Sequence, residues 1–68
     1  MQPQTLHLKR IEIPVHYDMW MRGARFGLVT SIGPGGEFIR VRLDAAPRRR
    51  LKVWRADLEY VRVCGGTA

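Results

Sequence analysis

The chain has little of what small domains use for covalent or metal-based stabilisation. Its 68 residues include a single cysteine, Cys64, so no disulfide can form within one chain. The side chains that suit zinc are those of His7, His16 and Cys64, and they lack the compact spacing of a zinc site. The sequence therefore predicts no metal and no other cofactor. A small apolar core, or association with other chains, must supply the stability.

Signals for export and for membrane insertion are also missing. No run approaches the roughly 18 consecutive apolar residues of a membrane span. Residues 1–5 lack the basic segment and the following apolar run of a signal peptide. With one cysteine and no export signal, we expect a cytoplasmic protein.

Groups that suit catalysis are sparse. Residues 33–36 (GPGG) lack the Lys-Ser/Thr pair and the helix of a phosphate loop, so they are predicted to form a turn. His16 and Asp18 combine a base with an acid, but the sequence places no nucleophile or second carboxylate beside them. Cys64 has no basic neighbour assigned to activate its thiol. We therefore predict that the chain is not an enzyme and has no catalytic residue.

Alternation of apolar and polar residues is the clearest pattern that is present. Helical spacing is poor, because Gly and Pro interrupt every candidate helix. Pro14 restricts the first strand to an edge or terminal position, and its pairing is left open. Residues 16–23 are expected to be irregular, with Tyr17 and Trp20 closing one end of the fold or lining a peptide groove. The segments with a strand pattern are 6–15, 24–32, 37–43, 50–54 and 59–63.

Turn signals join these strands into an all-β fold. Residues 33–36 make a hairpin of the second and third strands, and residues 55–58 form a single 3₁₀ turn before the last strand. We predict a small barrel, closed or partly open, of about five strands. Residues 1–15 are its N-terminal strand or arm, residues 16–64 the barrel and residues 65–68 a disordered tail. The predicted core-facing residues are Ile39, Val41, Leu43, Leu51, Val53, Val61 and Val63.

Turn and core positions over residues 20–63 resemble those of a known family. The pattern is Gly23-x-Arg25-x-Gly27-x-Val29-x-x-Ile32, then Ile39-x-Val41-x-Leu43-Asp44, then Val53-x-x-x-Asp57-Leu58-Glu59-x-Val61. It resembles the SH3-like barrels of the KOW type, and short phage or prophage proteins of unknown function with the same layout. The resemblance implies an SH3-like barrel whose partners are RNA or ribosomal and transcription proteins. Other SH3-like barrels bind peptides or build assemblies.

Residues 51–59 (LKVWRADLE) are similar to a stretch of the plasmid-borne type II dihydrofolate reductases. These enzymes are SH3-like barrels that form a tetramer around one pore. Their pore motif, Val-Gln-Ile-Tyr, falls on residues 51–54, where Lys52 replaces the glutamine and Trp54 the tyrosine. The groups that would hold cofactor and substrate are missing. This second resemblance therefore implies a shared fold without the activity.

Positive charge is concentrated in one part of the chain. Residues 38–55 contain seven Lys or Arg residues against Asp44 alone, which accounts for the whole net charge of +6. If strands 37–43 and 50–54 pair, as consecutive strands usually do, the outer face combines cations with aromatic rings. Tyr60 and Arg62 are expected to extend this face on the last strand. The residues that share it on the paired strands are Phe38, Arg40, Arg42, Lys52 and Trp54.

Such a face suits a nucleic acid. Guanidinium groups bind phosphates, and aromatic rings stack on exposed bases. The sequence does not distinguish DNA from RNA as the partner. The alternative function is binding of an acidic protein partner, or homo-oligomeric assembly, through Tyr17, Trp20 and Trp54. A further hypothesis is that the face is solvated and binds no ligand. The predicted nucleic-acid-binding residues are Phe38, Arg40, Arg42, Arg48, Arg49, Arg50, Lys52, Trp54, Arg55, Tyr60 and Arg62.

Overall fold

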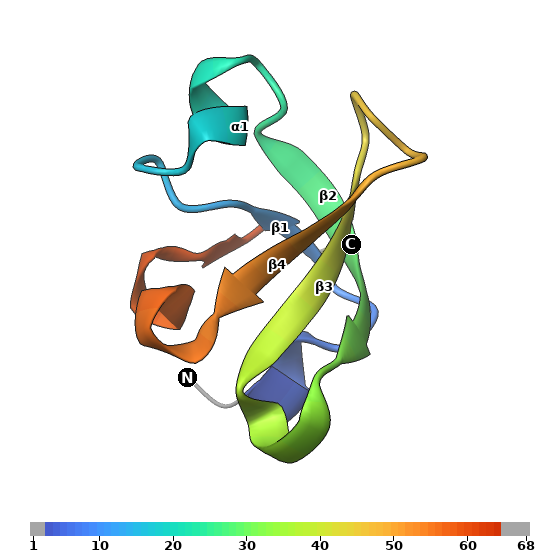
Figure 1. Cartoon of the computed structure of the whole chain (residues 1–68), viewed down its shortest axis with the longest axis vertical. Helices are drawn as coiled ribbons and strands as arrows, with labels where there is room; N and C mark the ends of the chain where they lie inside the picture. Colours follow the sequence, from blue (N-terminus) through green and yellow to red (C-terminus); the bar gives the residue numbers. More distant parts are fainter. Residues whose placement is uncertain (1–2, 65–68) are drawn as a thin grey trace.

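Five antiparallel strands form one sheet in the order β4-β3-β2-β1-β5 in the computed structural model, which describes residues 3–64 (Figure 1). The prediction of a mostly β domain with five strands is confirmed. No ladder joins the end strands β4 and β5 within residues 3–64, so strand pairing does not close the sheet into the expected barrel. The strands are β1 (Arg10–Glu12), β2 (Phe26–Ile32), β3 (Phe38–Leu43), β4 (Arg50–Trp54) and β5 (Arg62–Val63).

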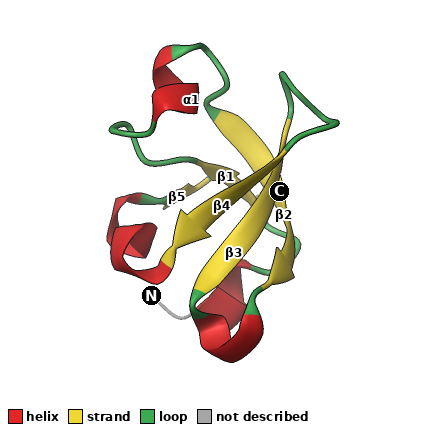
Figure 2. Ribbon diagram, viewed as in Figure 1, coloured by secondary structure: helices red, strands yellow, loops and turns green. Residues whose placement is uncertain are grey.

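Short helical turns connect the strands (Figure 2). The 3₁₀ turn predicted before the last strand is present and is two residues longer than expected. Gly35 and Gly36 have φ angles of 66° and 71° at the tip of the β2–β3 hairpin, in the left-handed region that favours glycine. All helical turns in residues 3–64 are too short to span a lipid bilayer. They are η1 (Pro3–Leu6), α1 (Asp18–Met21), η2 (Pro34–Gly36) and η3 (Arg55–Tyr60).

The first strand is much shorter than predicted. The expected strand 6–15 is reduced to β1, because Leu6 ends η1 and Leu8 has a φ of 61°, which breaks the extended chain. β1 lies between β2 and β5, inside the sheet. Pro14, which lacks an N–H, follows the strand and does not interrupt its pairing.

The last strand also differs from the prediction for residues 59–63. The amide of Val61 donates to the carbonyl of Leu58 (3.1 Å), so the helical turn continues through Tyr60 and only two residues remain for β5. Val63 was expected to face the core, and this was wrong, since the side chain is 45% exposed. β5 is an end strand of the sheet, and within residues 3–64 its outer side has no strand partner.

The core lies on the inner face of the curved sheet. Val61 and Leu58 cover it from the C-terminal side and are almost fully buried, as is Ile11 on β1. Leu51 packs against the core but is only partly buried. The predicted inward positions on β3 and β4 that are confirmed as buried are Ile39, Val41, Leu43 and Val53. The predicted disordered tail, residues 65–68, lies outside the described residues.

Candidate nucleic-acid interface

The register of β3 and β4 places cations directly opposite one another. Arg40 pairs with Lys52 and Arg42 pairs with Arg50, with Val41 and its partner between the two pairs. Directly opposite residues project from the same face of a sheet. Because Val41 faces the core, the four cations lie on the outer face. We call these two cross-strand pairs the basic rows.

The next cross-strand pair toward the hairpin is Phe38 with Trp54. Phe38 was expected to be free to stack on a base, and this was wrong, because the residue is buried, with only 8% of its surface exposed. Gly33 makes room for the ring, since a Cβ there would lie 2.6 Å from Phe38 Cζ. The Arg40 guanidinium carbon and the Lys52 Nζ lie 5.0 and 4.8 Å from the ring centroid.

Trp54 remains available as a stacking platform. Its side chain is 50% exposed, and its ring meets the Phe38 ring edge to face, with the centroids 5.3 Å apart. The Lys52 Nζ lies 5.9 Å from the Trp54 ring centroid. An indole held at the end of two rows of cations suits a flat aromatic group that is attached to phosphates.

No carboxylate of residues 3–64 neutralises the basic rows. Arg40 Nη1 donates to Ser31 Oγ (3.3 Å) and Arg50 Nη1 to the Pro47 carbonyl (3.2 Å), both uncharged acceptors. Asp44 is the single acidic residue between positions 38 and 55, and it forms an ion pair with Arg10 on β1. Like charges opposite one another destabilise a sheet unless something compensates them. Within residues 3–64 the basic rows therefore carry positive charge that no ion pair compensates.

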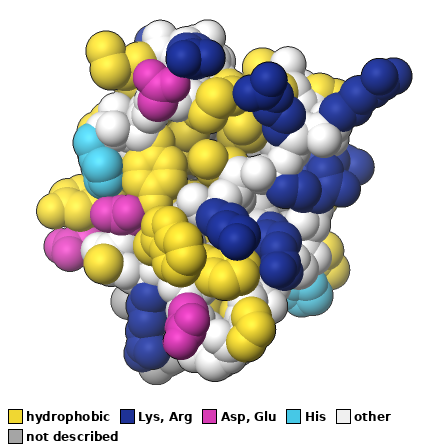
Figure 3. Space-filling view, in the orientation of Figure 1, with side chains coloured by type: hydrophobic (Ala, Val, Ile, Leu, Met, Phe, Trp, Pro, Cys, Tyr) yellow, Lys and Arg dark blue, Asp and Glu magenta, His cyan; other side chains and the backbone are white. Residues whose placement is uncertain are grey.

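Further cations flank the rows. Arg48 and Arg49 are exposed in the loop between β3 and β4, and Arg55 is exposed at the first position of η3. Figure 3 shows Lys and Arg side chains gathered over β3, β4 and the loop that joins them, beside a patch of hydrophobic side chains. These side chains can steer or hold an anionic polymer that lies on the rows.

Tyr60 and Arg62 do not continue the basic rows. Tyr60 is the last residue of η3, and its ring centroid lies 5.2 Å from that of His16. Arg62 lies on β5, directly opposite Glu12 of β1. Both residues line a separate hollow of about 390 Å³, which is described further below.

A hydrogen-bonded cluster, absent from the sequence predictions, lies beside Trp54. The Tyr17 hydroxyl donates to Asp57 Oδ2 (2.6 Å) and accepts from the Trp54 amide (3.3 Å). His16 Nε2 lies 3.3 Å from Asp57 Oδ1, so His16 meets Asp57 and not Asp18, which pairs with Arg22. Burial, followed by the hydrogen bond to Asp57, raises the pKa of Tyr17 to about 12. This phenol is thus held neutral and serves as a tie between the loop and η3.

In residues 3–64 no three His, Cys, Asp or Glu side chains come together as a metal site would require. Cys64 is a free, partly buried thiol. Comparison with protein-family models, with curated proteins and with solved structures finds no match for this chain.

Proposed function

We propose that this chain is a small, non-enzymatic SH3-like module that binds nucleic acid through the basic rows. The observation that carries the proposal is the pair of directly opposed like charges, Arg40 with Lys52 and Arg42 with Arg50, without a carboxylate partner in residues 3–64. A phosphate placed between two cations of a row supplies the missing counter-charge and accepts a charge-assisted hydrogen bond from each. Trp54 then stacks on a neighbouring base.

Strand order supports the SH3-like part of the proposal. Five antiparallel strands, with the helical turn η3 directly before the last of them, are compatible with the barrel that the KOW-type resemblance implies. In this proposal the sheet curls so that β5 approaches β4 across η3. The resemblance implies RNA or ribosomal and transcription proteins as partners, and the basic rows suit RNA because backbone phosphates are common to all sequences.

The first prediction tests the rows by fluorescence anisotropy of labelled single-stranded and duplex DNA and RNA. The double variant Arg40→Gln/Arg42→Gln should bind about tenfold more weakly, because two phosphate contacts are lost. For a single strand the log–log slope of affinity against salt should fall by about 0.7 for each lost contact. Trp54→Ala should weaken single strands more than duplex, since only unpaired bases stack on the indole.

The matched control is Lys9→Gln/Arg22→Gln, which removes the same charge from exposed positions outside the rows. It should keep most of the affinity. An equal loss of affinity in both double variants would mean that binding depends only on net charge, and it would contradict the rows as the binding site. No binding by the unmodified protein at low salt would contradict the proposed function as a whole.

The alternative of a protein-interaction or assembly module is favoured by a different observation. Several large apolar side chains are exposed, and exposed apolar groups that cluster mark interaction surfaces. Sedimentation equilibrium at high protein concentration distinguishes the two, since a defined oligomer supports assembly and a strict monomer opposes it. The exposed apolar side chains are Leu8, Val15, Met21, Phe26, Trp54, Tyr60 and Val63.

A further inference from the structure

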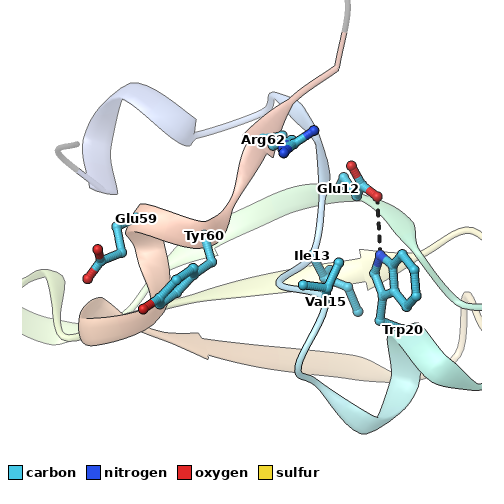
Figure 4. A pocket seen from close by; sticks show the side chains of 7 residues that line it. All are labelled: Glu12, Ile13, Val15, Trp20, Glu59, Tyr60 and Arg62. Atoms are coloured by element: carbon cyan, nitrogen blue, oxygen red, sulfur yellow. Dashed lines mark hydrogen bonds between the residues drawn. The ribbon is translucent and has the colours of Figure 1, made fainter.

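A hollow lies between the α1–β1 part of the chain and the η3–β5 part, apart from the basic rows. Figure 4 shows Ile13 and Val15 between Trp20 on one side and Glu59 and Tyr60 on the other. Ile13 is buried, whereas Val15 and Tyr60 are more than half exposed. The hollow thus has an apolar floor and two aromatic walls that solvent can reach.

Among the residues that line the hollow, acidic side chains outnumber basic ones. Glu12 and Glu59 line it together with Arg62, in a chain whose net charge is +6. Within residues 3–64 neither carboxylate takes part in an ion pair. Trp20 Nε1 donates to Glu12 Oε2 (3.1 Å), which fixes that carboxylate at the edge of the indole and leaves its other oxygen without a partner among these residues.

The Trp20 ring already attracts a cation of a particular kind. The guanidinium carbon of Arg25 lies 4.0 Å from the Trp20 ring centroid. Guanidinium groups stack on aromatic rings and form two parallel hydrogen bonds to a carboxylate. An ammonium group stacks on an aromatic ring less well, and it cannot form two parallel hydrogen bonds to a carboxylate. The rings and carboxylates of the hollow therefore favour a guanidinium over other cations.

We propose that this hollow binds an arginine side chain from a basic partner peptide. Its aliphatic stem lies over Ile13 and Val15, its guanidinium reaches Glu59 and Glu12, and the rings of the two walls flank it. Two carboxylates at the site repel phosphate, so this ligand differs in class from the one proposed for the basic rows. The inference stands whether or not the rows bind nucleic acid.

Arg62 and Glu59 are expected to have opposite effects on the affinity of the hollow for arginine. It lies directly opposite Glu12 in the β1–β5 register and lines the same hollow, so its charge opposes an incoming arginine. Arg62→Gln should tighten binding by about threefold, and Glu59→Gln should weaken it by about threefold, which is the usual size for an exposed ion pair. A purely structural role for these exposed residues would not give opposite signs.

The test is a nuclear magnetic resonance titration of the ¹⁵N-labelled protein with Nα-acetyl-arginine N-methylamide. Nα-acetyl-citrulline N-methylamide is the matched probe, because it keeps the shape of the side chain and removes its charge. The chain has two tryptophans, so their indole N–H signals report the two regions separately. The Trp20 signal should shift in a saturable way with the arginine probe and not with the citrulline probe, while Trp54 stays unchanged.

Three results would overturn the proposal. One is an equal response to both probes, another is a response confined to Trp54, and the third is an unchanged affinity in Glu59→Gln. The dispersion of each variant's spectrum checks that it is folded. Because Glu59 and Arg62 are both exposed, neither substitution removes a core contact.

Discussion

At the scale of single residues, Tyr17 joins parts of the chain that are 40 residues apart. Its hydroxyl bridges the Asp57 carboxylate and the Trp54 amide, and so fixes the loop before α1 against the start of η3. The neutral phenol is the form that donates to a carboxylate. Burial disfavours the charged phenolate, and the hydrogen bond to Asp57 and the negative charge of that carboxylate disfavour it further, which explains the raised pKa.

The phenol predicts a pH-dependent loss of stability. Tyrosine in the unfolded chain loses its proton near pH 10, whereas folded Tyr17 keeps it to about pH 12. The contribution of Tyr17 is therefore complete below about pH 10 and is lost as the pH rises through about 12. Tyr17→Phe should lower the free energy of unfolding by about 1–2 kcal/mol at pH 8. Urea titrations at pH 8, 10 and 11 should show the gap between the two proteins narrowing; a constant gap would contradict the assignment.

At the scale of elements, the β3–β4 ladder has a composition that works against its own stability. Val41 and its cross-strand partner Leu51 pack the ladder against the core. In the pair on either side of them, two cations lie opposite each other. Phe38 offsets part of this cost, because its ring lies near both cations of one row. The other row, Arg42 with Arg50, has no ring beneath it among the aromatic contacts of residues 3–64.

Arg42→Gln should therefore stabilise the fold by about 0.5 kcal/mol at low salt, while it weakens anion binding. Thermal unfolding monitored by circular dichroism at low salt measures the gain in stability, and the same measurement at high salt shows how far salt screens the repulsion. Arg22→Gln is the control, since it breaks the ion pair with Asp18 and should bring a small loss instead. A loss of stability in Arg42→Gln at low salt would show that the row is compensated within the protein.

Sequence patterns predicted the middle of the sheet better than its ends. Segment 50–54 matches β4 and segment 37–43 begins one residue before β3, because their alternation spans at least five residues and a glycine turn fixes the hairpin. β1 and β5 have three and two residues, too few for alternation to place. The outer position of Trp54 was predictable from the same alternation, and its role as a base platform stays a prediction.

The features that sequence reasoning missed depend on contacts between distant residues. The burial of Phe38 requires the missing Cβ of Gly33 and two cations above the ring. The hollow combines Glu12, Trp20 and Glu59, which lie on three different elements. No local spacing marks either arrangement, because the register and the curvature of the sheet bring these side chains together.

At the scale of the whole molecule, a small core supports two surfaces of opposite charge. A domain of this size rarely gains more than about 3–5 kcal/mol from its core. The buried residues come from all parts of the described chain, from Leu6 in η1 to Val61 after η3. Each core side chain is therefore a large fraction of the total stability, whereas exposed side chains are free to serve ligands.

Val41→Ala should lower the free energy of unfolding by about 2 kcal/mol, because it leaves a cavity at a fully buried site. For a domain of this size this corresponds to a fall of about 10 °C in Tm. Val63→Ala makes the same chemical change at an exposed site and should shift Tm far less. Differential scanning calorimetry of both variants checks the prediction. Equal shifts would contradict the placement of the core.

The ion pair between Arg10 and Asp44 has a consequence for how binding strength can change during evolution. Arg10 lies on β1, outside the basic rows, yet it occupies the single carboxylate of residues 38–55. A substitution at position 10 would release Asp44, which could then turn toward the cations of β3 and compete with an anionic ligand. Under the proposed function, affinity can thus be adjusted from a residue outside the basic rows, which lets selection weaken the interaction while leaving the four cations of the rows in place.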